Sequence, residues 1–117
     1  MEVVIDSQEF LPLREPTFFI LLSISTGQKH GYAILQEVET LSKGKIRLSN
    51  GTLYGALTRL QGEGLIERIP SNEPGTSGKP RKAYQLTKIG MEVLQAEIDR
   101  LALLVNTARR HLPEGAE

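Results

Sequence analysis

The stretch from residue 49 to residue 86 constrains the fold of this 117-residue chain more than any other feature. Ser49 has a hydroxyl suited to an N-cap and Gly64 stands where a left-handed C-cap is expected, so a helix is predicted between them. Two strand-like runs follow, at residues 65–70 and 83–86, on either side of a long loop rich in Gly, Pro and cations. A helix followed by a hairpin with a basic tip predicts a winged helix-turn-helix fold. The apolar face of the helix carries Leu53, Ala56, Leu57 and Leu60.

Three other segments have the apolar spacing of helices. In residues 16–25, Pro16 suits the first turn and apolar side chains surround most of the circumference, which predicts a buried helix. Residues 32–41 are apolar on one face only. Residues 88–112 follow Thr87, a capping residue. The predicted class is therefore mainly α, with a small β-hairpin wing and a long C-terminal helix.

The connections predict one domain with extensions at both ends. Residues 26–31 read as a turn and residues 45–48 as a short segment that could be extended. The structure of the first 14 residues is left open. The expected divisions are an N-terminal extension (1–14), a winged-helix domain (15–87), a dimerisation helix (88–112) and a tail (113–117).

The C-terminal helix carries an apolar heptad seam. A helix of ~25 residues is ~37 Å long at about 1.5 Å per residue, so much of it should project past a winged-helix body. A helix packed on its own domain would show a similar stripe. We expect burial against the same helix of a second copy, with a wider apolar surface at Leu103 and Leu104. The expected dimer interface is Met91, Leu94, Ile98, Leu101, Leu104, Val105, Ala108 and Leu112.

Charge is balanced overall but unevenly distributed. The chain has 14 Lys and Arg against 14 Asp and Glu. Residues 45–90 hold 8 basic and 3 acidic side chains, whereas residues 1–44 and 91–117 have net charges of −3 and −2. The one cationic segment is thus the helix with its hairpin, which favours a polyanionic partner. Such clusters are also typical of a solvated surface.

The outer face of the 49–64 helix is lined by small residues. Gly51, Gly55 and Gly62 lie opposite the leucines, together with Thr58 and Arg59. Such a face lets the backbone approach another surface closely, and Arg and Thr bond base edges and phosphates. The alternative is a loosely packed surface helix, in which each Gly costs about 1 kcal/mol relative to Ala.

The returning arm of the hairpin is basic. Lys79, Arg81 and Lys82 could reach a phosphate backbone while the preceding helix lies in the major groove. Lys and Pro on an edge strand also protect against aggregation, which is the alternative role.

Four segments together resemble the PadR family of bacterial transcriptional regulators. They are H-G-Y at 30–32, S-N-G-T-L-Y-G-A-L at 49–57, R-L-Q-G-E-G-L-I-E at 59–67 and G-K-P-R-K-A-Y-Q-L-T-K-I-G at 78–90. The resemblance covers about residues 16–90. It implies a repressor that binds palindromic double-stranded operator DNA as a homodimer and that, in many members, is released by a small-molecule effector.

The chain departs from the family pattern at four positions. Asn50 and Gly55 stand where Pro is common, Lys79 replaces a common Arg, and Ala83 replaces a common aromatic residue. These changes affect the helix start and the wing, so the operator sequence is not carried over from the family.

The resemblance also implies which residues face DNA. Tyr32 and Tyr54 have a second interpretation, as half-buried core rings. The implied recognition-helix positions are Ser49, Asn50, Gly51, Thr52, Tyr54, Gly55, Thr58 and Arg59; the wing positions are Ser77, Gly78, Lys79, Arg81 and Lys82; the positions near the DNA backbone are His30 and Tyr32.

Other function classes fit poorly. The chain has no Cys, so a disulfide, a thiolate metal site and a Cys nucleophile are excluded. Its two His have no partner at metal-ligand spacing and no phosphate-binding loop is present, so we expect neither an enzyme nor a cofactor. The apolar run at residues 18–24 is too short to span a membrane and no signal peptide precedes it, which predicts a cytoplasmic protein.

Two alternatives stay open. A winged helix can also serve as a protein-interaction module without specific DNA binding. The chain has no Trp and a single C-terminal helix where longer family members have a larger domain, so the sequence leaves both the existence and the identity of an effector open.

Overall fold

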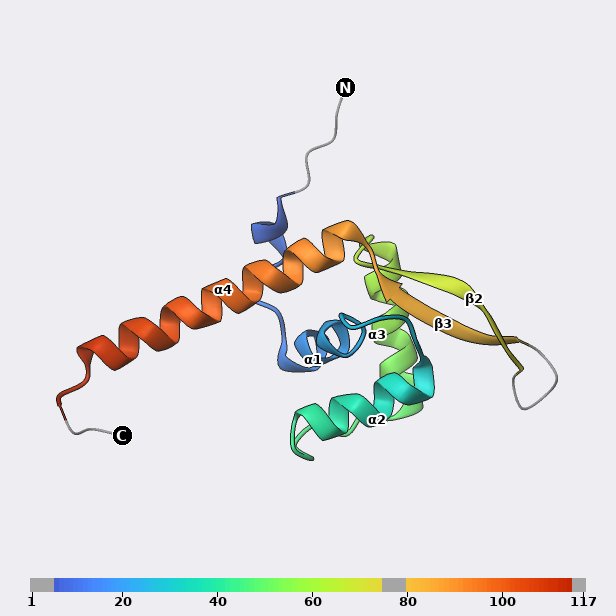
Figure 1. Cartoon of the computed structure of the whole chain (residues 1–117), viewed down its shortest axis with the longest axis horizontal. Coiled ribbons are helices and arrows are strands. Elements are labelled where there is room, and N and C mark those ends of the chain that lie inside the picture. The colour runs from blue at the N-terminus through green and yellow to red at the C-terminus, as the bar shows by residue number, and fades with distance from the viewer. Residues whose placement is uncertain (1–5, 75–79, 115–117) are drawn as a thin grey trace, which may run out of the picture.

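The shorter helices pack together beside a small antiparallel sheet whose hairpin projects from the body, and one long helix runs away from the body in another direction (Figure 1). The computed structural model describes residues 6–74 and 80–114. In chain order the elements are η1 (Ser7–Phe10), α1 (Glu15–Ser23), β1 (Lys29–His30), α2 (Gly31–Leu41), α3 (Asn50–Gly62), β2 (Ile66–Pro74), β3 (Pro80–Leu86) and α4 (Lys88–His111). The winged helix-turn-helix predicted from the sequence is confirmed, with a hairpin longer than the two predicted strand runs.

The core lies where α1, α2, α3 and the start of α4 meet. Ile20 and Leu21 of α1 are fully buried, which explains why apolar residues surround that helix. From α2 and α3 the apolar faces predicted from the periodicity point into the same core. The buried apolar residues include Ile20, Leu21, Ile34, Val38, Leu53, Leu57, Leu60, Val93 and Leu94.

The sheet contains a strand that the sequence pattern did not predict. Its order is β1-β3-β2, and both neighbouring pairs are antiparallel. In β1, Lys29 pairs with Tyr84 and His30 pairs with Ala83. The prediction of a turn over residues 26–31 is therefore wrong at its last two positions before α2. Residues 45–48, which the sequence left as possibly extended, do not pair as a strand in the described part of the chain.

Local capping sets the ends of α3. The Ser49 hydroxyl accepts a hydrogen bond from the Thr52 amide at 3.1 Å, as the sequence predicted. At the other end Gly64 has φ of +79°, the left-handed conformation that favours glycine.

The start of α4 is held tightly against the corner between α3 and β2. The Thr87 hydroxyl donates to the Gly64 carbonyl at 2.6 Å, and the Thr87 amide donates to the Leu65 carbonyl at 3.1 Å. A Cβ on Gly90 would lie 1.9 Å from the Leu65 carbonyl oxygen, so only glycine permits this approach. The residues after Arg100, by contrast, are all exposed as far as residue 114.

The predicted dimer seam divides into two parts. Leu94 is only 2% exposed and belongs to the core of its own subunit. Its assignment to a dimer interface is therefore wrong, because the first turns of α4 cover the domain before the helix projects. The other seven predicted interface residues are exposed in a single subunit.

The segment of residues 6–14, part of the region whose structure the sequence left open, lies against α4. The Asp6 side chain caps η1, and η1 contacts α4. Phe10, Leu11 and Leu13 then pack against the core before α1 begins. This segment therefore belongs to the folded body.

Candidate nucleic-acid interface

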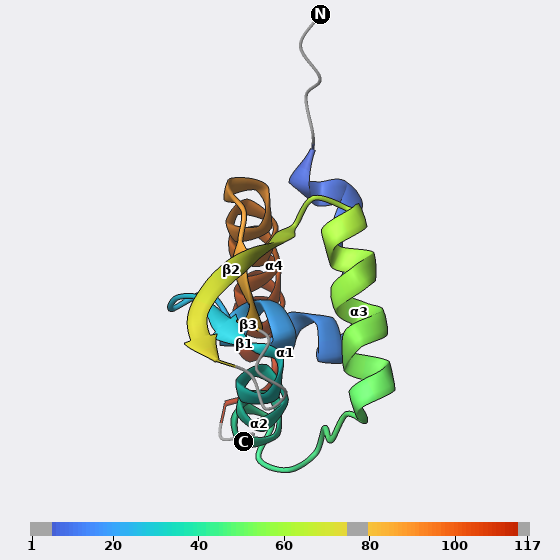
Figure 2. The same cartoon turned by 90° about the vertical axis from the view of Figure 1, so that its right-hand side faces the viewer.

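The outer face of α3 is open along the length of the helix (Figure 2). Asn50, Gly51, Thr52, Gly55 and Thr58 are all exposed. In the described part of the chain, no atom would lie within 4 Å of a Cβ on Gly51 or Gly55. Neither packing within the subunit nor a positive φ requires these glycines. The face can therefore admit a second surface close to its backbone.

Tyr54 joins this face to the start of α2. Its hydroxyl oxygen would lie 2.4 Å from a Cβ on Gly31, so the close contact depends on glycine at that position. Tyr54 remains 44% exposed, and the neighbouring Tyr32 is 60% exposed. For Tyr54 the interpretation as a half-buried ring is confirmed, and because the ring still faces outward its DNA-facing role stays a prediction. For Tyr32 the interpretation as a half-buried core ring is wrong.

The hydroxyls of the α3 face are already hydrogen-bonded within the helix. Ser49 both caps the helix and donates to the Thr52 side chain at 2.9 Å. The Thr58 hydroxyl donates to the Tyr54 carbonyl at 2.9 Å. Ser49 is thus committed to the cap, whereas the exposed threonines keep acceptor capacity for a further bond.

Arg59 is bound to its own protein. Its guanidinium lies 3.0 Å from the Glu63 carboxylate and donates to the Thr17 hydroxyl, also at 3.0 Å. Thr17 is buried in α1, so Arg59 bridges α1 and α3. The base-reading role predicted for Arg59 competes with both contacts, and we do not carry it into the proposed interface.

The wing meets the start of α2 through β1. The His30 ring nitrogen Nδ1 lies 3.3 Å from the Lys82 carbonyl oxygen, and the Lys82 side chain is exposed. Arg81 precedes it on β3. Ser77, Gly78 and Lys79 lie outside the described residues. The described end of the predicted wing site therefore adjoins the Tyr32 and Tyr54 side of the body.

A buried tyrosine supports the base of the wing. Burial raises the pKa of the Tyr84 phenol, the nearby Tyr54 phenol raises it further, and Arg68 on β2 opposes both effects. Tyr84 therefore stays neutral at physiological pH and acts through packing.

The sequence prediction missed Arg47, which lies two residues before the α3 cap. Its side chain is 75% exposed and forms an ion pair with Glu39 at 2.9 Å. Its position in the cationic segment was the available signal, but the predicted site began only at Ser49. Among the described residues Arg47 is a cation beside the helix N-terminus that sequence reasoning omitted.

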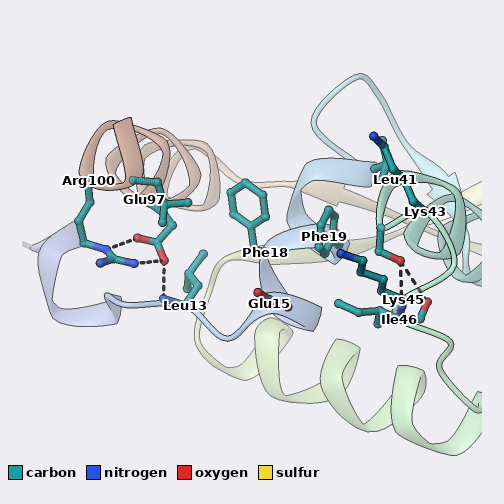
Figure 3. A pocket seen from close by; sticks show the side chains of 12 residues that line it. Leu13, Glu15, Phe18, Phe19, Leu41, Lys43, Lys45, Ile46, Glu97 and Arg100 are labelled. Carbon is teal, nitrogen blue, oxygen red and sulfur yellow. Dashed lines mark hydrogen bonds and ion pairs between the residues drawn. The ribbon is translucent and has the colours of Figure 1, made fainter. Parts of the chain in front are cut away.

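A groove with both apolar and charged lining residues lies beside α4 where the helix leaves the body. A cavity of about 500 Å³ opens between α1, the loop after α2, and α4 (Figure 3). Phe18 and Phe19 lie in it with ring centroids 5.5 Å apart in an edge-to-face arrangement. Leu41, Ile46 and Leu101 are further apolar lining residues. The groove thus continues the exposed seam of α4 onto the body.

Neither a metal-ion site nor a membrane-spanning helix is found in residues 6–74 and 80–114. No group of three or more His, Asp or Glu residues there could hold a metal ion. Within the same residues, no helix combines the length and the apolar character needed to span a membrane.

Both the sequence and the fold are similar to those of known proteins. Residues 20–96 match the family described as "Transcriptional regulator PadR-like family". A PadR family transcription regulator from Clostridium difficile R20291 is 25% identical with a TM-score of 0.69, covering 86% of this chain and all of that chain. A PadR-like transcriptional regulator from Bacillus cereus is 27% identical with a TM-score of 0.66, covering 86% of this chain and 92% of that chain.

A further relative is much longer. An uncharacterized 37.1 kDa protein in transposon TN4556 of Streptomyces fradiae is 36% identical over 85 residues, or 73% of this chain. The chain spans 22% of the length of that relative.

Proposed function

Since this chain belongs to the PadR-like family of transcriptional regulators, which are not enzymes, we propose that it is a repressor that binds a palindromic DNA operator as a homodimer. In this proposal the outer face of α3 enters the major groove, and the wing and the start of α2 contact the flanking backbone. Such a regulator acts in the cytoplasm, where bacterial DNA lies.

One observation supports the assignment of the DNA-binding surface to α3. The exposed face of α3 presents Gly51 and Gly55, which no contact in the described part of the subunit requires, beside Thr52, Thr58 and the exposed ring of Tyr54. A helix without side chains along part of its outer face lets base edges approach its backbone. The proposed contact residues are Asn50, Gly51, Thr52, Tyr54, Gly55 and Thr58 on α3, Lys79, Arg81 and Lys82 on the wing, and Tyr32 at the start of α2.

The second half of α4 supports the homodimer. Leu101, Leu104 and Val105 are large apolar side chains that remain exposed in the isolated subunit. A second copy of α4, lying along this stripe and over the adjoining groove, would remove both from water. Two recognition helices related by a two-fold axis suit a palindrome with half-sites about 34 Å apart.

Selection of bound fragments from random duplex DNA tests the proposal. We expect a two-fold symmetric consensus, a dimer in sedimentation, and an affinity for random duplex that falls steeply as salt rises. A protein that retains no duplex DNA or heparin even in dilute salt would instead be a protein-interaction module. That result would overturn the proposed function.

A further inference from the structure

The direction of α4 depends on its junction with the body, on the packing of Val93 and Leu94 in the core, and on an attachment further along the helix. The first is the junction described above, where Thr87 bonds to the corner after α3 and Gly90 allows close contact with Leu65. The junction and the buried side chains of Val93 and Leu94 hold the first two turns of α4. The attachment further along holds the helix at its last buried turn, where it limits the angle most.

The attachment further along α4 is a buried carboxylate. Glu97 is 1% exposed, and its Oε2 accepts a hydrogen bond from the Leu13 amide at 2.7 Å. Arg100, one turn further along α4, donates to both carboxylate oxygens, with Nε 2.5 Å from Oε1 and Nη2 3.1 Å from Oε2 (Figure 3). We call residues 6–14 together with Glu97 and Arg100 the N-terminal clasp.

The position of the clasp along α4 determines how far the exposed end of the helix can move. At about 1.5 Å per residue, Glu97 lies about 10 Å from Gly90 along the axis and His111 lies about 31 Å from it. A sideways movement at Glu97 is therefore enlarged about threefold at the far end of the helix. Residues 102–111 are all exposed in the subunit and cannot correct such a movement.

We propose that Glu97 is a positioning residue whose clasp sets the angle between α4 and the DNA-binding body, and thereby the half-site spacing that the dimer accepts. The proposal rests on the proposed function, because α4 must join the two subunits for its angle to set the distance between the two copies of α3. A loosened clasp then yields a dimer that still forms and still reads each half-site but tolerates several spacings.

The first experiment measures the angle without DNA. Because the chain has no Cys, residues Gln61 on α3 and Thr107 on α4 can be changed to Cys and spin-labelled at exposed positions. Labelled protein is mixed with excess unlabelled protein, so that each distance comes from one subunit. In Glu97→Ala we expect the distribution of distances between the two labels to broaden by about twofold or more. A small sideways movement of α4 at position 97 becomes a larger displacement at position 107, further along the helix. An unchanged distribution would overturn the proposal.

The second experiment measures spacing preference on the selected operator. Operators with one base pair added or removed between the half-sites should lose on the order of tenfold or more in affinity for the natural protein. For Glu97→Ala this ratio should fall to a few-fold, while the dimer content in sedimentation is unchanged. Affinities that drop equally for every spacing would assign Glu97 a purely structural role and overturn the proposal.

Two further variants keep the test valid if Glu97→Ala folds poorly. Glu97→Gln retains an oxygen for the Leu13 amide but loses the ion pair with Arg100, so an intermediate effect is expected. Asp99→Asn removes the same charge from an exposed residue that bonds only to Gln95 in the described contacts, and it should behave as the natural protein does. If the natural protein itself binds no symmetric operator, the proposed function fails. If both Glu97 variants keep the sharp spacing preference of the natural protein, the proposed role of the clasp fails and the proposed function stands.

Discussion

The outer faces of α3 and α4 are both exposed, yet their chemistry is opposite. The face of α3 combines glycines and threonines with one tyrosine, and its glycines border open space. The second half of α4 carries Leu101, Leu104 and Val105, and Leu112 follows at its C-cap; all four are large, apolar and exposed. Water solvates the first face well and the second poorly, so the two faces call for different partners. Exposure alone therefore does not identify a DNA-binding surface. The glycines on the α3 face, which have no side chain, are equally informative.

The largest expected effect comes from placing a charge in the exposed apolar surface of α4. Leu101→Asp places a charge in the proposed interface, where desolvation without a partner is unfavourable. We expect a monomer in sedimentation and a loss of operator affinity on the order of 100-fold or more, because linked binding is lost. Asn106→Asp adds the same charge at an exposed position off the seam and should keep both properties. A monomeric Leu101→Asp protein with full affinity would refute the link between dimer and operator.

The α3 face can be blocked without harming the fold. Gly55→Gln adds a side chain where the described subunit has open space, and it should raise helix stability by about 0.5–1 kcal/mol. Operator affinity should nevertheless fall on the order of tenfold, or about 1.4 kcal/mol, because the backbone can no longer approach the bases. Thermal melting and fluorescence anisotropy measure the two effects. Gly62→Gln, at the far end of the helix, is the control, and equal affinity losses in both variants would count against the proposed face.

A substitution of Arg59 tests whether this residue belongs to the proposed DNA-binding surface of α3. Arg59→Ala removes the contacts to Thr17 and Glu63, so we expect the free energy of unfolding to fall by about 0.5–1.5 kcal/mol. The sequence preference and the slope of log affinity against log salt should stay unchanged. A slope smaller by about one would show instead that Arg59 contacts a phosphate in the complex.

The smallest expected effect is a pH dependence at the clasp. The hydrogen bond from Arg100 lowers the pKa of Glu97 below the ordinary value of 4.5; burial opposes this, and the Leu13 amide and the Arg100 charge add to it. Because the folded-state pKa is the lower one, the stabilisation is present above about pH 4.5 and is lost as the pH falls through the folded-state pKa. Glu15, Lys43 and Lys45 line the same groove and add their own charges.

Denaturant titrations between neutral and acidic pH measure this contribution. Glu97→Gln should flatten the acidic limb of the stability profile relative to the natural protein, with Asp99→Asn as the control. A profile that is the same in the natural protein and in Glu97→Gln would contradict the linkage.

Features that depend on neighbours along the chain were predictable from the sequence. The Ser49 cap and the left-handed Gly64 each involve only the adjoining turn, so residue type and spacing suffice. The strand β1 was missed because two residues are too short to show any alternation, and it forms only when β3 is present to pair with it.

The sequence by itself determined the helices, their apolar faces, the hairpin and the concentration of positive charge, because periodicity and capping are local properties. Only the tertiary structure decided which exposed residues are available to a partner. The seam of α4 is continuous in sequence, yet Leu94 is buried in the core and Leu101 is not, because the body ends between them. Arg59 meets Thr17 across 42 positions and Glu97 meets Leu13 across 84, and contacts at such separations leave no periodic trace in the chain.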